Sequence, residues 1–408
     1  MTSPHSQASG ASAKPVLTLK EAFERYREDL CLFRKDGRLG VLPAVIGTVF
    51  FERGSKPDVR QGLLACFNRF EELFGEQLRS CARGGKFTRY TASGMKGVQR
   101  TILETPPHQK VEVLCSSAPD QDTAAGYQIE TLTNDENLSD YTLPGTTHVI
   151  PKGDDGGDLS YLKFQLPMDA MATSYGLKQY QDFLHFVCRQ LPVRGGYGGL
   201  SAVLPYSFHR YMPTEWALAT RFSGLEIDSY GFTQTRTYKT YSYEGPSLEK
   251  LEHYYPHPKL GAKTGAWGYI KSINWVTVLG DLFVQRLGGE ARIRHALARP
   301  DIGIECIGSC LLIRAGAFPR LGAPEEGLPE PYVFVNRVLR VLRNPNPEQL
   351  HTHIEGVPSA DADNTKAWEA RFDLPGSLPI PTPPDIVPAP DDEWMKKAYW
   401  PHFKGDHP

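Results

Sequence analysis

The chain has 408 residues, of which 40% are hydrophobic and 23% charged, and its formal net charge is −2. These values are typical of a globular protein and exclude collagen-like, coiled-coil and fully disordered chains. A general nucleic-acid binder needs a basic surface to neutralise phosphates, and the chain as a whole has no excess of basic residues. No segment approaches the roughly 18 apolar residues of a membrane span. We therefore expect neither nucleic acid nor a membrane as a direct partner.

The N-terminal segment and the cysteines indicate the cellular compartment. Residues 1–16 are small and polar, lack the apolar core of a secretory signal, and are predicted to form a disordered tail. The seven cysteines are odd in number and lie mostly in apolar segments, which favours reduced thiols over a disulfide framework. These features predict a cytoplasmic protein.

Apolar periodicity predicts one folded body over residues 17–345. In the first half of the chain, the pattern predicts a helix at 18–33, a strand at 39–51 and a helix at 58–78. The stretch 87–164 is predicted to consist of strands, including 111–115, 127–132, 147–150 and 161–166. The rest is predicted to form a helix at 176–191, a glycine-rich strand after it, a short helix from Pro213, a helix at 270–287, one or two strands at 302–313 and a helix at 331–342. The order is not a regular alternation, so an α+β fold with mixed or antiparallel sheets packed with helices is favoured over a doubly wound sheet. Residues 346–408 are proline-rich and are predicted to be an extended C-terminal segment.

Enzyme signatures are sparse in this sequence. It has no GxxxxGK[ST] loop, no HExxH and no GxSxG motif. The glycine cluster 195–199 (GGYGG) lacks the spacing of a dinucleotide-binding turn, and it predicts a bulge or a close approach of two backbones instead. Cys306 and Cys310 have no second cysteine pair and are predicted to pack as small apolar side chains.

One histidine cluster leaves a metal site open as an alternative. His351, His353 and Glu355 occupy alternate positions, so on a strand they would lie on one face at a spacing that a metal accepts. Metal sites need three or four ligands, and no second cluster pairs with this one. A polar surface strand is the favoured interpretation, and a metal-dependent hydrolase is the alternative.

Two acidic features are candidates for binding a partner protein. The first is a loop of crowded carboxylates, consisting of Asp154, Asp155 and Asp158. The second is an aromatic-rich stretch that contains Glu215, Glu226 and Asp228. Acidic side chains among aromatic ones can bind a basic protein surface. The alternative interpretations are a solvated loop for the first feature and capping or core polar pairs for the second.

Two longer segments carry a family resemblance. RYMPTEWALATRFSGLEID (210–228) and IKSINWVTVLGDLFVQRLGG (270–289) occur in this order after GGYGGL and LPYSFHRY. Together they resemble the family of type VI secretion immunity proteins that neutralise nuclease effectors of the VRR-Nuc kind, over about residues 18–345.

The resemblance implies a cytoplasmic protein that binds a toxin and is not itself an enzyme, and it implies no cofactor. The expected partner is a cognate nuclease effector with a PD-(D/E)xK-type fold, and binding would protect the producing cell from DNA damage. Whether the inhibitor plugs the active site or shields the DNA-binding face stays open, as does the free protein's oligomeric state. A secretion-system adaptor or loading chaperone is a further alternative.

Overall fold

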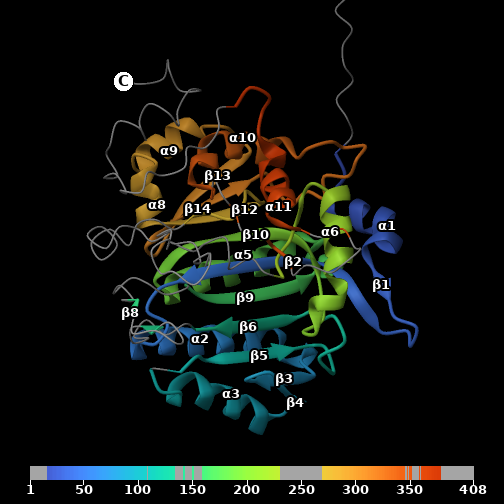
Figure 1. Cartoon of the computed structure of the whole chain (residues 1–408), viewed down its shortest axis with the longest axis vertical. Helices are drawn as coiled ribbons and strands as arrows, with labels where there is room; N and C mark the ends of the chain where they lie inside the picture. Colours follow the sequence, from blue (N-terminus) through green and yellow to red (C-terminus); the bar gives the residue numbers. More distant parts are fainter. Residues whose placement is uncertain are drawn as a thin grey trace, which may run out of the picture.

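The computed structural model describes residues 16–107, 109–133, 159–229, 269–344 and 360–377, the strand pair 141–142 and 149–150, and residues 347, 349–351 and 358. In this part of the chain, 12 strands form one sheet with the main order β13-β14-β12-β10-β2-β9-β6-β5-β3-β4, and β1 and β11 pair with β2 and β10 (Figure 1). The β10–β11 pair is parallel, and the other named pairs of this sheet are antiparallel. The predicted α+β class with mixed or antiparallel strands is confirmed.

The bounds of the elements follow the chain. The strands are β1 (Leu32–Phe33), β2 (Leu39–Phe51), β3 (Ser80–Arg83), β4 (Lys86–Arg89), β5 (Glu112–Ser116), β6 (Gln128–Leu132), β7 (Tyr141–Thr142), β8 (Val149–Ile150), β9 (Ser160–Pro167), β10 (Val193–Val203), β11 (Leu225–Glu226), β12 (Val276–Gly280), β13 (Ile302–Ile307) and β14 (Cys310–Ala315). The α-helices are α1 (Leu19–Leu30), α2 (Pro57–Phe74), α3 (Ala92–Glu104), α4 (Met168–Met171), α5 (Ser174–Gln190), α6 (Met212–Arg221), α8 (Asp281–Arg286), α9 (Glu290–Ala296), α10 (Glu330–Leu339) and α11 (Ala362–Glu369). Short 3-10 turns include η6 (Ala370–Phe372).

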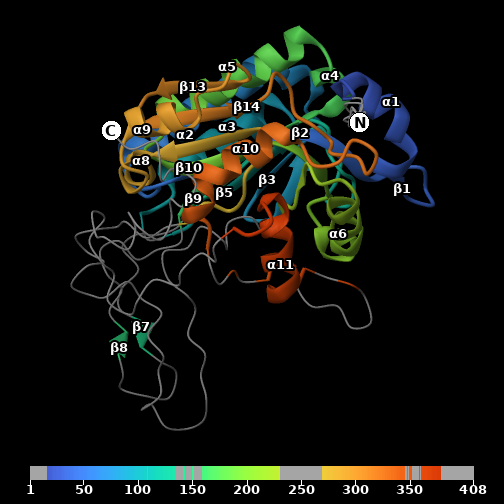
Figure 2. The same cartoon turned by 90° about the horizontal axis from the view of Figure 1, so that it is seen from above.

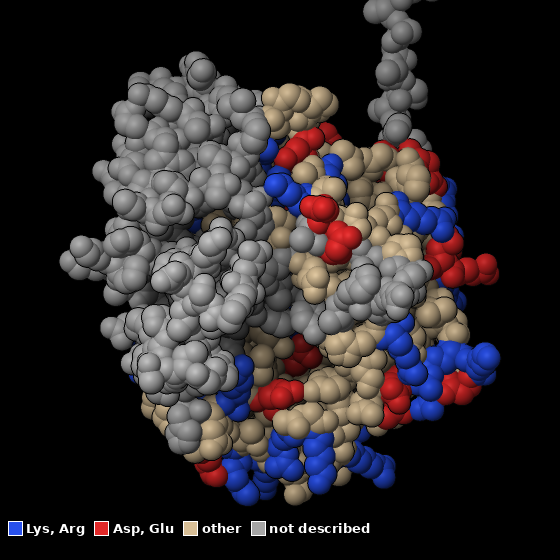
Figure 3. All heavy atoms as spheres, in the orientation of Figure 1, with Lys and Arg blue, Asp and Glu red and all other residues tan. Residues whose placement is uncertain are grey.

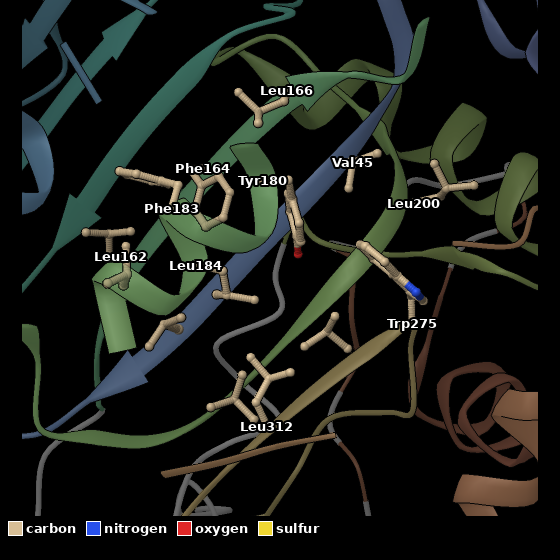
Figure 4. Close-up of a cluster of buried hydrophobic side chains, with 14 of the residues drawn as sticks. Val45, Leu162, Phe164, Leu166, Tyr180, Phe183, Leu184, Leu200, Trp275 and Leu312 are labelled. Carbon is tan, nitrogen blue, oxygen red and sulfur yellow. The ribbon is translucent and has the colours of Figure 1, made fainter. Parts of the chain in front are cut away.

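The two faces of the sheet differ in chemistry. Helices α2, α3 and α5 cover one face, whereas α6 and α11 lie on the other side (Figure 2). Burial alternates along β9, because successive side chains of a strand point to opposite faces. Phe164 points towards the helical layer, where it meets Phe183 of α5 with ring centroids 4.8 Å apart (Figure 4). We call the opposite face, which carries Tyr161, Lys163 and Gln165, the polar face.

The glycine cluster allows the two central strands to approach closely. Strands β10 and β2 pair antiparallel, with a register irregularity between Val193 and Gly195. A Cβ atom on Gly196 would lie 2.5 Å from the carbonyl oxygen of Thr48, so no larger residue fits there without moving the backbone. Of the two predicted uses of this cluster, the close approach of two backbones is confirmed.

Three sequence predictions are corrected. The helix expected over 270–287 is instead strand β12 followed by the short helix α8, because the segment around Val276 is buried between β10 and β14 and pairs with both. The region of expected strands after residue 87 contains helix α3, which Thr91 caps by accepting from the Gly94 N–H. Cys310 is buried as expected, but Cys306 is exposed.

The C-terminal segment is partly helical rather than extended. Within residues 346–408, helix α11 begins after Asp361, whose side chain accepts from the Asn364 N–H. Buried Trp368 and Phe372 attach α11 and η6 to the hydrophobic core. The prediction of an extended segment is therefore wrong for residues 362–372, and the boundaries proposed at residues 16 and 345 stay predictions. In the described residues, no helix has the length and apolarity needed to cross a membrane.

Candidate functional site

A row of polar side chains crosses the centre of the sheet on the polar face. The paired positions are Tyr197 in β10, Thr48 in β2, Lys163 in β9 and Glu130 in β6. Residues paired across antiparallel strands project on the same face, so these four side chains stand side by side. The row forms part of the floor of a pocket.

The pocket has a volume of about 490 Å³ and lies above β6, β9 and the end of β10. Its described lining includes the carboxylates Glu112, Glu130, Glu215 and Asp228, the aromatic residues Tyr161, Tyr206 and Phe208, and the cation Lys163. Lys163 is the sole lysine or arginine in that described lining, so acidic groups outnumber basic ones. Acidic side chains are visible in the hollow at the centre of this face (Figure 3). We call this pocket the acidic pocket.

Asp228 lies in the wall of the acidic pocket and is bonded to the polar row. Its Oδ1 accepts from the Thr48 hydroxyl at 3.0 Å and also from the Tyr197 hydroxyl. Its Oδ2 lies 3.2 Å from the Lys163 ammonium, which also donates to the Asp228 carbonyl at 2.5 Å. The Asp228 side chain is 15% exposed, so it retains a surface in the pocket.

Glu215 holds the backbone of this wall from helix α6. Its Oε1 accepts from the backbone N–H groups of Asp228 at 3.0 Å and Ser229 at 3.3 Å. Its Oε2 accepts from the Ser229 hydroxyl at 2.5 Å and lies 2.8 Å from Nε2 of His351. Both Glu215 and His351 are buried. Glu215 therefore acts as a support for the wall.

Glu226, two residues before Asp228 in the chain, forms a buried ion pair. The Lys271 ammonium lies 2.5 Å from its Oε1, and both side chains are fully buried. Its Oε2 accepts from the Ser272 hydroxyl at 2.5 Å and the Asn274 amide at 3.1 Å. Glu226 has no exposed surface in this structure, so it is a core polar pair, the alternative interpretation of this residue, and offers no surface to a partner.

The other sequence candidates are distributed differently. His351 is bonded to Glu215, whereas its expected companions His353 and Glu355 lie outside the described residues. The acidic loop of Asp154, Asp155 and Asp158 also lies outside them. In the described part of the chain, no group of three or more histidine, cysteine, aspartate or glutamate side chains could hold a metal ion.

Sequence reasoning missed the floor of the acidic pocket. Glu130 and Lys163 lie in strands that were predicted correctly, and their alternate spacing with buried residues was the available signal. Burial raises the pKa of the Glu130 carboxyl, although Lys163 opposes this effect. The Glu112 carboxylate accepts from the Tyr206 hydroxyl at 2.5 Å. The distance in sequence between these strands concealed their common pocket.

A second charged cluster joins the C-terminal helix to the body. Burial alone would raise the pKa of Asp373, but its hydrogen bonds to Arg343 and Arg340 lower the pKa to about 2. Burial raises the pKa of the nearby Glu369 carboxyl to about 8, although Arg343 and Lys271 oppose that shift. At neutral pH the folded protein therefore favours a protonated Glu369.

This protonation predicts that the contribution of Glu369 to stability falls with rising pH. Folded Glu369 retains a proton up to about pH 8, whereas its unfolded form releases one near its ordinary value of 4.5. Because unfolded Glu369 binds fewer protons in this window, its contribution to the free energy of unfolding decreases from pH 5 to pH 8. Glu369→Gln should reduce that decrease by more than about 1.4 kcal/mol, measured by urea unfolding at both pH values. Glu72→Gln, at a 64% exposed side chain, is the control and should leave the decrease unchanged.

The fold is shared with a protein of a bacterial secretion system. The Pseudomonas aeruginosa T6SS protein PA0821 has a similar structure, with a TM-score of 0.67 and 20% sequence identity, covering 87% of this chain and 91% of that chain. A likeness at this identity shows a common α+β fold. No curated protein matches this sequence significantly.

The family follows from the sequence match. The family described as type VI immunity for VRR-NUC (TsiV) matches residues 62–246 and 258–372. These two ranges make up more than half of the chain, so the protein belongs to this family of type VI immunity proteins. The resemblance found in the sequence is thereby confirmed.

Proposed function

We propose that this protein binds a cognate VRR-Nuc effector, inhibits its nuclease activity, and so protects the producing cell from DNA damage. The family match over residues 62–246 and 258–372 carries this proposal. The protein acts by binding alone, without catalysis, in the cytoplasm where the effector would reach DNA.

The acidic pocket supports this proposal through charge. A nuclease needs a basic surface to bind the phosphates of DNA. A pocket in which carboxylates outnumber cations is complementary to such a surface, and complementary charge accelerates association and favours the correct partner. Asp228 and Glu130 present this charge, while Glu215 keeps the wall in place. The loop of Asp154, Asp155 and Asp158 stays a proposed second contact.

Co-expression with the effector's nuclease domain, taken from the gene beside this one, tests the proposal. We expect restored growth, a one-to-one complex in size-exclusion chromatography and loss of DNA cleavage by the purified complex. An effector variant with an inactive nuclease site is the control and should still form the complex.

The same experiment separates the alternatives. An adaptor or loading chaperone would bind the effector but leave DNA cleavage intact. A metal-dependent hydrolase would restore growth without a stable complex, and its activity would disappear with a chelator. An active effector that is neither bound nor inhibited would contradict the proposed function.

A further inference from the structure

We propose that the acidic pocket receives an arginine side chain of the effector, with Glu130 and Glu112 as its carboxylate partners. The inference rests on the proposed function and specifies the chemistry of the contact.

The two carboxylates are neighbours on the same face of the sheet. Glu112 of β5 pairs with Leu132 of β6, and Glu130 lies two residues before Leu132. Glu112 and Glu130 are therefore diagonal neighbours on the polar face, with Cα atoms about 7–8 Å apart by general sheet geometry. One planar guanidinium, with donors on both sides, can reach two carboxylates at this spacing.

Both carboxylates have unused capacity. Glu112 accepts from Tyr206 through Oε1, and Glu130 accepts from Gln128 through Oε2 at 3.1 Å. Among the described residues, neither second oxygen accepts a hydrogen bond and neither carboxylate forms an ion pair within 4 Å. Lys163, the sole lysine or arginine of the described lining, is bonded to Asp228 instead. An incoming cation would therefore meet carboxylate oxygens that no described cation contacts directly.

Burial makes a carboxylate without a direct cation unfavourable in the unbound protein. The Glu130 carboxyl is desolvated enough for its pKa to be raised despite Lys163. A partially buried carboxylate without a direct cation is stabilised when a positive charge arrives. Such a site favours a cationic ligand over water.

The walls of the acidic pocket favour a guanidinium among cations. Tyr161, Tyr206 and Phe208 line it, and a planar guanidinium can stack on aromatic rings as well as bond carboxylates. The volume of about 490 Å³ lies within the range of ligand pockets, about 300–1,000 Å³.

The wall is also fixed before any partner arrives. Glu215, which lines the pocket and is 1% exposed, holds the backbone at Asp228 and Ser229 and is itself bonded to buried His351. The hydrogen bonds to Glu215 offset the cost of burying its carboxylate. A wall positioned in this way reduces the ordering cost of binding.

Affinity for the effector tests the proposal in the full-length protein. We expect the double variant Glu112→Gln with Glu130→Gln to raise the dissociation constant for the effector at least tenfold, as measured by titration calorimetry. The matched control, Glu72→Gln with Glu104→Gln, removes the same charge from exposed helical positions and should change it less than twofold. Glu130→Gln alone, with near-UV circular dichroism as the folding check, replaces the double variant if that fails to fold.

A scan of the effector then identifies the arginine. Each surface arginine of the nuclease domain is changed to glutamine, and a double-mutant cycle with Glu130→Gln measures the coupling. We expect one arginine whose replacement weakens binding of the effector to the wild-type protein tenfold. The same replacement should hardly change binding to the Glu130→Gln variant. Equal affinities of the wild type and the pocket variant, or no coupled arginine, would overturn the proposal and leave immunity standing.

A small probe tests the acidic pocket without the effector. We expect methylguanidinium to show saturation-transfer NMR signals with the wild type that disappear in the double variant. Stronger binding of n-butylammonium would overturn the choice of arginine, and absent binding of both would overturn a cation site. Failure of the wild type to bind the effector would instead contradict the proposed function.

Discussion

Replacing Lys271 by methionine is expected to lower the free energy of unfolding by about 3–5 kcal/mol, because it leaves the Glu226 carboxylate buried without a cation. Both side chains are fully buried, and the Lys271 ammonium also donates to the Ile227 carbonyl. Two protein groups therefore lose their partner at once. Urea unfolding at pH 7 measures the loss.

A control for this variant lies on the surface. Lys178 and Asp182 form an ion pair of similar length, 2.6 Å, but their side chains are 69% and 57% exposed. Lys178→Met should cost no more than about 0.5 kcal/mol, since water and ions screen such pairs. Adding Glu226→Gln to Lys271→Met should recover part of the loss. Equal losses for the Lys271 and Lys178 variants would contradict the assignment of a buried ion pair.

Replacing Gly196 by alanine is expected to destabilise the protein by about 3 kcal/mol, at the upper end of the usual cost of overpacking. The added Cβ atom would lie 2.5 Å from the Thr48 carbonyl oxygen and 3.2 Å from the Val49 Cα. Both neighbours are backbone atoms of β2, so relief requires the two central strands to separate. Thermal and urea unfolding measure the effect.

Gly75 provides the matched control for this substitution. It lies at the C-terminal end of α2 with φ −57° and ψ −33°, a conformation that alanine adopts readily. An added Cβ atom would meet only the side-chain atoms Glu71 Cγ at 3.4 Å and Tyr90 Oη at 3.9 Å, both at ordinary contact distance. Gly75→Ala should be neutral or stabilise by up to about 1 kcal/mol, because alanine restricts the unfolded chain. A comparable loss at both glycines would show that strand spacing is not the cause.

Local pattern predicted most of the elements of this fold. The capping box of Thr18 and Glu21 and the apolar stripe behind it predict α1, and period-two alternation predicts β6 and β9. Strand β12 was mistaken for a helix because a strand buried on both faces shows no alternation. In that case the spacing of Ile273, Val276 and Leu279 imitates a helical face.

The candidate site was less predictable, since its contacts are long-range. Glu215 and Glu226 lie close in sequence, but their partners do not. Glu215 is bonded to His351, which lies 136 residues further along the chain. Glu226 is paired with Lys271, which lies 45 residues further along the chain. Sheet order also brings Glu112, Glu130 and Lys163 together from three strands. The periodicity of a sequence does not specify which strands become neighbours. The burial and the partners of these charged residues are therefore seen only in the structure.

The alternation along β6 and β9 has an evolutionary consequence. Gln128 and Glu130 of β6 face the acidic pocket, while the alternate residues Ile129 and Thr131 are buried on the opposite side. Neighbouring residues of one strand are therefore exposed to different selection. Under the proposed function, substitutions that face the pocket can follow changes in the effector while the buried residues preserve the fold. Sequences in such a lineage should then diverge with a period of two along these strands.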